Sequence, residues 1–347
     1  MMPWIMTIAT TAFRPPDAAV LRPPETGAPR SSSLNLEAKR ALGALLPLID
    51  RPELRDVLIQ VREGVGTLWL DEGRSMRRVP DWSCTPDALR GLAVSLIAAG
   101  GRHIDELHPC ADVKIGDGIR VHAVLAPACT TGAAVSIRMP RPRPLGFDEL
   151  TAAGLCSARV AETLRDAVRR RCNVLITGGT GTGKTTVLGA LLDLSAPEER
   201  IITIEDVAEL RLRHEHWVAL EARQANSEGV GSLSLDRLLR EALRMRPDRI
   251  VLGECRGGEI TTLLTALNTG HDGGAGTLHS SGLRDVPARL EALGALGGLD
   301  PAALARQVRS ALHLVVHLHR SPGGRHSVAA LGQFVLQRDR LEIRELR

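Results

Sequence analysis

The chain of 347 residues is poor in aromatic side chains, with three phenylalanines, four tryptophans and no tyrosine. Proteins that bind single-stranded nucleic acids stack the bases on aromatic rings, and this composition leaves little material for such platforms. The formal net charge is only +4 and is spread along the chain, whereas nucleic-acid binders usually concentrate basic residues on one surface. The composition therefore argues against a nucleic-acid partner.

Long apolar runs and paired cysteines are also missing. The longest weakly polar run, residues 91–101, is shorter than the ~18 residues that a membrane-spanning helix needs. Residues 1–13 carry no basic residue ahead of their apolar part, which is untypical of a secretion signal. The six cysteines include no C-x-x-C pair, so neither a disulfide framework nor a zinc site is indicated. We therefore expect a cytoplasmic protein whose thiols are buried.

Lysine is scarce too. Of the 44 basic residues, only Lys39, Lys114 and Lys184 are lysines, and the remaining 41 are arginines. An ammonium group is a compact point charge, whereas a guanidinium is a planar fork, so the two are not interchangeable in a closed site. Lys184 lies within a glycine-rich motif, where the bias toward arginine gives way to a chemical requirement.

The length exceeds the usual ~100–200 residues of one domain and predicts two domains. Residues 1–33 mix prolines and small residues without periodicity and are predicted to form a flexible tail. Residues 34–139 alternate helix-like and strand-like patterns, which predicts a small α+β domain. The alternating prolines of residues 140–146 cannot continue a helix or a central strand, so they predict a linker.

Residues 147–347 alternate short apolar strands with helices. This order predicts a mostly parallel sheet with helices on both faces, an α/β fold. The strands predicted here are residues 173–177, 201–204 and 249–253, and the helices are residues 158–171, 184–192 and 235–244. In the first domain, the predicted strands are residues 56–61, 67–71, 120–125 and 134–139, and a helix is predicted to run from Pro86 to Gly100.

A phosphate-binding motif, G-x-x-x-x-G-K-T, follows the first strand of the second domain and opens a helix. Glycines let the backbone wind around a phosphate, so that N–H groups and the helix N-terminus point at its oxygens. Lys184 is expected to reach the β and γ phosphates, and the Thr185 hydroxyl to ligate Mg²⁺. The nucleotide-binding residues predicted from this motif are Gly178, Gly179, Thr180, Gly181, Thr182, Gly183, Lys184, Thr185 and Thr186.

Carboxylates end two of the predicted strands. Glu254 follows residues 249–253, and a strand parallel to that of the phosphate loop would deliver it beside Mg²⁺ and the γ-phosphate. Glu205, Asp206 and Glu209 follow residues 201–204, and such clustered acids repel one another unless a cation is present. An exposed acidic turn is the alternative for this cluster. We expect Glu205 and Asp206 to lie near the metal.

Two histidines, His271 and His279, flank a glycine-rich loop ahead of a further expected strand. No cysteine or third ligand accompanies them, so a metal site is not indicated. From the residues alone, exposed surface histidines are the ordinary interpretation.

Four segments together resemble a known family. The segments are, in order, the phosphate loop, Ile-Glu-Asp-x-x-Glu, Gly-Glu-Cys-Arg-Gly and Gly-His…Thr-Leu-His. Their order and spacing resemble those of the Walker A, aspartate, Walker B and histidine boxes of the type II and type IV secretion ATPases. The likeness covers about residues 35–345. Within the family the chain looks most like the ATPase of tight-adherence (Flp-type) pilus assembly, in its arginine-rich actinobacterial form.

The resemblance implies a PAS-like domain followed by a RecA-like domain, assembled as a homohexamer with ATP between the two domains. It implies that Glu254 is the Walker B carboxylate, that Glu209 is a candidate general base, and that His279, with His271, senses the nucleotide. Whether Glu209 or Glu254 orients the attacking water is left open. Arg120 and Arg138 would reach the γ-phosphate, for which a bidentate guanidinium is suited, and pairing with a structural carboxylate is the alternative for both.

The function implied is Mg²⁺-dependent ATP hydrolysis that powers pilus assembly or protein secretion at the inner face of the cytoplasmic membrane. The expected partner is an inner-membrane platform protein. A RecA-like nucleic-acid translocase is one alternative, against which the scarce aromatics count. An interaction module that binds ATP with little turnover is the other, and the presence of Lys184, Thr185 and Glu254 counts against it.

Overall fold

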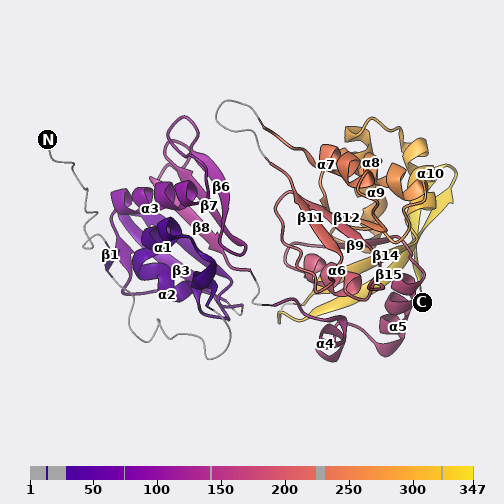
Figure 1. Ribbon diagram of the computed structural model, residues 1–347, viewed down its shortest axis with the longest axis horizontal. Helices are drawn as coiled ribbons and strands as arrows, with labels where there is room; N and C mark the ends of the chain where they lie inside the picture. Colours follow the sequence, from indigo (N-terminus) through magenta and orange to yellow (C-terminus); the bar gives the residue numbers. More distant parts are fainter. Residues whose placement is uncertain are drawn as a thin grey trace. The chain divides into compact units, whose positions relative to one another are not determined.

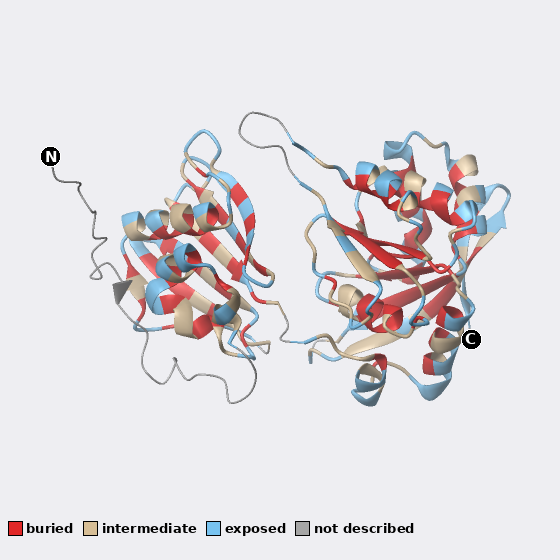
Figure 2. Ribbon diagram, viewed as in Figure 1, coloured by how far each residue is buried: buried red, intermediate tan, exposed pale blue. Residues whose placement is uncertain are grey.

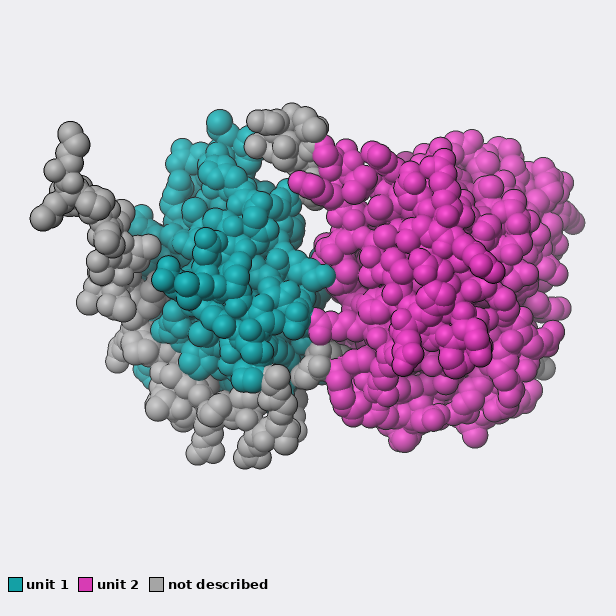
Figure 3. Space-filling model, viewed as in Figure 1, with its two compact units in different colours: residues 1–142 teal, residues 143–347 magenta. Residues whose placement is uncertain are grey.

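The computed structural model describes residues 13–14, 29–73, 75–140, 143–223, 231–321 and 323–346. The chain divides into two compact units, Met1–Pro142 and Arg143–Arg347, which Figure 3 colours separately. This division falls within the segment predicted as a linker, residues 140–146, of which residues 141 and 142 lie outside the described residues. Each unit is described by itself.

The first unit contains an antiparallel sheet with the strand order β1-β5-β3-β2-β8-β7-β6, and β4 pairs with β3. Its strands are β1 (Phe13–Arg14), β2 (Asp56–Arg62), β3 (Val65–Asp71), β4 (Met76–Arg78), β5 (Ser83–Cys84), β6 (Cys110–Ile115), β7 (Ile119–Leu125) and β8 (Ala133–Arg138). Its helices are η2 (Arg30–Ser33), α1 (Leu36–Leu42), η3 (Gly43–Leu45), α2 (Leu46–Ile49) and α3 (Pro86–Ala99).

The sheet of the first unit packs against its helices through every second side chain of its strands. In β7 every second residue is buried, as expected for a strand with one face against a core. The predicted helix after Thr85 is confirmed as α3, whose first turn is capped by the Thr85 side chain, which accepts a hydrogen bond from the Ala88 N–H. Figure 1 shows α1 and α3 across one face of the sheet, and the strands predicted for this unit match β2, β3, β7 and β8.

Residues 30–33, predicted to belong to a flexible tail, instead form the short helix η2. The Arg30 guanidinium donates to the carbonyls of Ile49 and Arg51 at 3.1 and 2.7 Å. The backbone N–H and the hydroxyl of Ser31 both donate to the Asp50 carboxylate. The prediction is wrong for these four residues, because long-range hydrogen bonds hold a segment that has no helical periodicity. Except for residues 13–14 and 29, the rest of the predicted tail lies outside the described residues.

The second unit contains a sheet with the strand order β11-β10-β12-β13-β9-β14-β15-β16. The strands from β11 to β14 in this order are parallel, while β15 and β16 are antiparallel to their neighbours. The strands are β9 (Val174–Gly178), β10 (Ile201–Glu205), β11 (Trp217–Glu221), β12 (Arg249–Cys255), β13 (Ala275–His279), β14 (Leu314–Arg320), β15 (His326–Gln337) and β16 (Arg340–Leu346).

Helices cover both faces of this sheet (Figure 1). Val174 and Ile176 of β9 pack in one apolar cluster with α4, α5 and α6, whereas Leu175 packs in another with α7 to α10. The predicted parallel sheet with helices on both faces is therefore confirmed. The helices are α4 (Phe147–Ala152), α5 (Ala158–Arg169), α6 (Lys184–Leu192), α7 (Leu235–Leu243), α8 (Glu259–Asn268), η4 (Leu283–Asp285), α9 (Val286–Leu296) and α10 (Pro301–Ala311).

Burial follows this layering. Figure 2 shows the central strands of the second unit as buried, with the exposed residues on the outer sides of the helices and in the loops. Because helices enclose them on both faces, β9 and β10 are buried at every residue, in contrast to the alternating burial of β7. In the described ranges, no helix combines the length and the apolarity required to cross a membrane.

Candidate functional site

The phosphate loop connects the end of β9 to the start of α6. Gly178, Gly181 and Gly183 all have positive φ angles, of 151°, 71° and 91°, which side-chain-bearing residues rarely adopt. Gly183 is the N-cap of α6 and has no side chain to occupy the first N–H groups of the helix. These groups remain available to an anion, so the local backbone explains why the motif requires glycine.

Lys184 closes the loop. Its Nζ donates to the carbonyls of Gly178 and Gly179, both at 3.0 Å, and the Thr182 hydroxyl also donates to Gly179, at 2.9 Å. Burial lowers the pKa of Lys184, and the positive charge of Arg256 lowers it further. The negative charges of Glu254 and Glu209 act in the opposite direction and raise it. The ammonium is thus held inside the loop, close to charged groups from two other strand ends. Thr185 and Thr186 follow it in the first turn of α6.

Parallel register brings the acidic strand ends to the same edge as the loop. β10 pairs with β12, β12 with β13, and β13 with β9, all in parallel. The carboxyl ends of these strands therefore meet at one edge. Glu205 is the last residue of β10, and Glu254 is the next-to-last residue of β12. The structure thus brings together the phosphate loop, Glu254 and the acidic segment at one edge of the sheet.

Glu205 is a buried carboxyl group with 5% of its surface exposed. It accepts hydrogen bonds from the N–H groups of Glu209 and Leu210 at 3.1 and 3.2 Å. Burial raises the pKa of Glu205 to about 7, although these two N–H groups act to lower it. A side chain on Gly253 would overlap the Cγ atom of Glu205, so glycine at that position makes room for the buried carboxyl. Glu205 is therefore built into the sheet rather than exposed in an acidic turn.

The raised pKa of Glu205 predicts how stability depends on pH. Between the ordinary carboxyl value of 4.5 and about 7, the folded chain keeps a proton that the unfolded chain has lost, so the free energy of unfolding falls as pH rises. Glu205→Gln removes this titration. We expect the loss of unfolding free energy from pH 5 to pH 8 to shrink by about 2 kcal/mol, measured by urea denaturation in EDTA.

The control for this prediction is Glu215→Gln, because Glu215 lies exposed between β10 and β11. This variant should keep the pH dependence of the wild-type chain. An unchanged pH dependence in Glu205→Gln would show that the Glu205 carboxyl is ionised in the folded chain at pH 5.

Arg256 is a residue of this edge to which the motifs assign no role. Its Nε donates to Glu254 Oε2 at 2.7 Å, and its Nη2 lies 2.5 Å from the same oxygen. Its Nη1 lies 3.6 Å from Asp206 Oδ2. One guanidinium therefore connects Asp206, which follows β10, with Glu254, near the end of β12. The only sequence signal was an arginine two residues after Glu254, which is common enough to pass unnoticed among 41 arginines.

The two histidines lie at opposite ends of β13. His279 is the last residue of β13, and its register partner on β9 is Gly178, so it stands at the beginning of the phosphate loop. His271 precedes β13, and its Nδ1 is 3.2 Å from the Ala266 carbonyl. Because the strands are parallel, His271 lies at the edge away from the phosphate loop. Only His279 of the pair is brought to the predicted site.

Arg120 and Arg138 are neighbours on the first unit's sheet, where they are register partners on β7 and β8. The Nε of Arg138 donates to Asp56 Oδ1 at 3.1 Å, which is the structural pairing with a carboxylate that the sequence left open. These residues belong to the first compact unit, and the phosphate loop belongs to the second. Their role at a nucleotide is taken up below as a proposal.

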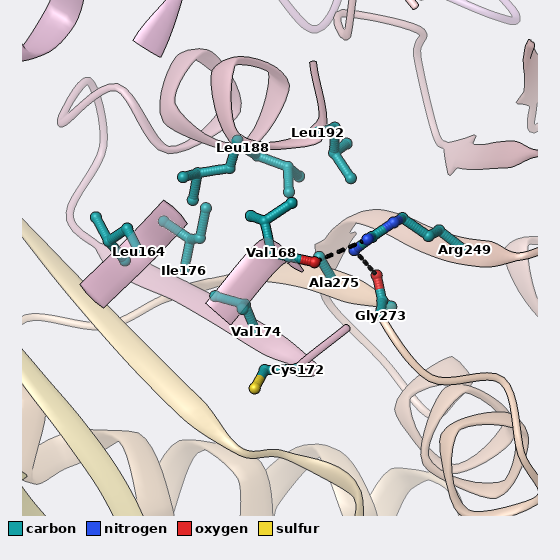
Figure 4. A pocket seen from close by; sticks show the side chains of 12 residues that line it. Leu164, Val168, Cys172, Val174, Ile176, Leu188, Leu192, Arg249, Gly273 and Ala275 are labelled. Atoms are coloured by element: carbon teal, nitrogen blue, oxygen red, sulfur yellow. Dashed lines mark hydrogen bonds between the residues drawn. The ribbon is translucent and has the colours of Figure 1, made fainter. Parts of the chain in front are cut away.

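An apolar cavity lies on the α6 side of the second sheet (Figure 4). Its lining includes the starts of β9, β12 and β13, so it lies toward the edge away from the phosphate loop. At its margin, Arg249 donates to the carbonyls of Gly273 and Val168. The apolar residues around it include Leu164, Val168, Val174, Ile176, Leu188 and Ala275. With such a lining, the cavity is a packing void and no nucleotide site.

The fold and this edge define the class of the protein. A parallel sheet with helices on both faces, a glycine-rich phosphate loop and carboxylates on adjacent strand ends are the features of a P-loop NTPase with a RecA-like core. The family model "Type II/IV secretion system protein" matches residues 92–337. The chain belongs to this family.

Similar proteins agree with the assignment. The chain is 45% identical over 295 residues to a putative conjugal transfer protein of Mycobacterium tuberculosis (strain ATCC 25618 / H37Rv), and the alignment covers 83% of each chain. It is 34% identical over 265 residues to the type IV secretion system protein PtlH of Bordetella pertussis, covering 69% of this chain and 76% of PtlH.

Among solved structures, the ATPase DotB of Legionella pneumophila has a similar fold, with a TM-score of 0.56 and 20% identity over 88% of this chain and 81% of DotB. The predicted family and the predicted fold class, a RecA-like core preceded by a smaller α+β domain, are confirmed. Together with the phosphate loop, membership of this family identifies the chain as an ATPase, as the sequence predicted.

Proposed function

We propose that the chain is a Mg²⁺-dependent motor that hydrolyses ATP to power pilus assembly or protein secretion at the inner face of the cytoplasmic membrane. The observation that carries this proposal is the phosphate loop closed by Lys184 at the same sheet edge as Glu205 and Glu254, in a chain of the type II/IV secretion family. The relatives are named for conjugal transfer and type IV secretion. Tight-adherence pilus assembly is the narrower function that we infer.

The chemistry of this edge suits Mg²⁺, which prefers oxygen ligands and keeps several waters and phosphate oxygens in its shell. Thr185 and Glu254 would hold the ion, directly or through water, with Glu205 and Asp206 nearby. In the part of the chain that the structure describes, no cluster of three or more histidine, cysteine or acidic residues forms a ready-made metal cage. An ion held jointly by a few side chains and the nucleotide requires no such cage. When bound, Mg²⁺ supplies positive charge at the phosphates.

The chain's own residues bind the phosphates and orient the attacking water. Lys184 exchanges its two loop carbonyls for phosphate oxygens, and the N–H groups of the loop and of the first turn of α6 surround them. Glu254 or Glu209 orients the attacking water. Arg256 holds Glu254 through a hydrogen bond from its Nε, so the guanidinium and the metal would compete for the same carboxylate.

We further propose that six copies form a ring in which Arg120 and Arg138 of the first unit bind the γ-phosphate. Loss of that phosphate on hydrolysis removes charge-assisted hydrogen bonds, which is the differential contact that a two-state motion requires. His279, beside Gly178, would report the occupancy of the loop. The motion would be passed to an inner-membrane platform protein.

The variant Glu254→Gln tests this proposal. It keeps the size and hydrogen-bonding capacity of the side chain but removes the charge that orients water or metal. We expect its kcat for ATP to fall at least ~100-fold, while Mg²⁺ and ATP together convert it to a stable hexamer. A phosphate-release assay and mass photometry, each with and without EDTA, measure the two effects. Wild-type turnover should disappear in EDTA.

Three outcomes would reject the motor. A chain that stays monomeric in Mg²⁺ and ATP has no ring with which to move a partner. Wild-type turnover no faster than that of Glu254→Gln would favour an interaction module instead. Stimulation of turnover by single-stranded DNA, lost steeply as salt is raised, would favour a nucleic-acid translocase.

A further inference from the structure

The hairpin formed by β14 and β15 lies against the phosphate loop. β14 runs parallel to β9, and Leu318 is the register partner of Gly178, the first residue of the loop. β14 continues for two more residues, so His319 and Arg320 extend alongside the loop. Arg320 is in turn the register partner of His326, the first residue of β15. In the strand order of the sheet, the hairpin lies on one side of β9, and the strands that carry Glu205 and Glu254 lie on the other.

His326 binds the backbone of the loop directly. Its Nδ1 lies 2.9 Å from the carbonyl oxygen of Thr182. A carbonyl only accepts, so Nδ1 carries the proton and donates it. The two residues are 144 positions apart in sequence, and Thr182 is almost fully buried. His326 thus fixes the carbonyl of a residue whose neighbours, Gly181 and Gly183, have left-handed backbone angles. We infer that it positions the loop.

Arg320 lies over the tip of the loop. Leu318 packs in the apolar cluster that contains α6, and because side chains alternate along a strand, Arg320 projects toward the same face. Its Nη1 stands 3.4 Å from the position that a Cβ atom on Gly181 would occupy. Within the described residues, its guanidinium has no ion-pair or hydrogen-bond partner. A cation with open donors therefore stands where the loop is built to receive an anion.

We propose that Arg320 is a further nucleotide-binding residue, which donates to the polyphosphate of the bound nucleoside diphosphate or triphosphate, while His326 is a positioning residue that holds the loop for it. The proposal rests on the proposed function, because it takes the phosphate loop as the nucleotide site. An arginine presents several donors in a planar fork and forms short, charge-assisted hydrogen bonds to phosphate oxygens. The phosphate loop itself then has two cations, Lys184 within it and Arg320 above its tip.

Arg325 on the same hairpin offers a matched control. It is also an arginine of the turn region, but its Nη2 is directed at the carbonyl of Gly154, between α4 and α5, at 3.5 Å. Arg325→Ala therefore removes an equal charge from the same hairpin without touching the loop. A difference in nucleotide affinity between Arg320→Ala and Arg325→Ala therefore reflects the position of the charge that is removed, because both variants lose the same charge.

The probe is fluorescent mant-ADP with Mg²⁺, bound to the full-length chain and followed by anisotropy. We expect Arg320→Ala to raise the Kd about tenfold, because it removes charge-assisted hydrogen bonds to the phosphate oxygens. Arg320→Lys should recover part of this loss, and Arg325→Ala should stay within twofold of the wild type. Melting temperatures should stay close to that of the wild type, because Arg320 is exposed.

His326 is tested in the same assay. His326→Ala removes the donor to Thr182 and should raise the Kd several-fold, whereas His326→Asn keeps a donor of similar reach and should restore binding. A merely structural role would lower the melting temperature of the alanine variant without a selective loss of mant-ADP binding. Such a result, with no rescue by asparagine, would remove His326 from the site.

The outcomes also separate this inference from the proposed function. If the wild type binds mant-ADP, Lys184→Ala does not, and Arg320→Ala binds as well as Arg325→Ala, the role of Arg320 is overturned while the nucleotide site stands. If the wild type fails to bind, or Lys184→Ala binds as tightly as the wild type, the nucleotide site itself is wrong and both proposals fall.

Discussion

Replacing Lys184 with alanine is expected to lower the kcat for ATP about 100-fold to 1,000-fold and to leave the fold intact. The Nζ atom donates to the Gly178 and Gly179 carbonyls, and in the complex it would neutralise the β and γ phosphates. Removing such a preorganised cation costs about 100-fold to 1,000-fold in kcat. The fold should be spared because Lys184 lies at the start of α6, is only partly buried and donates to two loop carbonyls. A phosphate-release assay at saturating Mg²⁺ and ATP measures the rate.

Lys39→Ala is the control for this result. Lys39 lies on α1 of the first unit, so the variant loses the same charge and side chain outside the phosphate loop. Its turnover should equal that of the wild type, and both variants should melt close to the wild type. Hydrolysis by Lys184→Ala within tenfold of the wild-type rate would overturn the nucleotide site placed at this loop.

Replacing Arg249 with alanine is expected to destabilise the second unit strongly. Arg249 begins β12 and is 3% exposed. Its Nε donates to Glu199 Oε2 at 2.6 Å, and its other donors bind the carbonyls of Gly273 and Val168. Removing one partner of a buried ion pair leaves an uncompensated charge and unpaired carbonyls, at a cost of about 3–5 kcal/mol. The melting temperature of this unit should fall by roughly 10 °C.

Arg244→Ala provides the comparison. Arg244 follows α7, and its pairing with Glu241 at 3.3 Å is exposed, with 77% of the arginine side chain and 50% of the glutamate accessible. Exposed pairs contribute about 0–1 kcal/mol, so this variant should melt within about 2 °C of the wild type. Differential scanning calorimetry measures both. Equal melting temperatures for the two variants would show that the Arg249 ion pair adds no stability.

The phosphate loop and the strand that carries it were predictable because their signals are local. Glycine at positions with positive φ, a lysine and a threonine at the start of a helix, and an apolar strand ahead of them lie within one short segment. The helix at Pro86 was predictable for the same reason, since the capping threonine, the proline and the closing glycine are neighbours in sequence. Periodicity and capping report interactions between residues only a few positions apart.

Other features of the site depended on which strands become neighbours. Glu205 packs against Gly253, which lies 48 positions later in the sequence. Its carboxyl group is buried in the fold, and this burial raises its pKa. Arg256 pairs with Glu254 and Asp206 only because β10 and β12 are adjacent. His271 and His279 flank the same glycine-rich segment in the sequence. They lie at opposite edges of the sheet because one precedes β13 and the other ends it. None of these relations has a periodic signal.

The sequence by itself determined the class of the protein, because its four ordered motifs carry their chemistry in local residue types and in spacing that a strand–loop–helix unit requires. Only the tertiary structure decided the composition of the site around those motifs. It placed Arg256 between two carboxylates and brought Arg320 and His326 to the loop from the far end of the chain. The physical reason is that sheet order and register arise from burial of apolar faces between distant segments, and no short stretch of sequence contains that information.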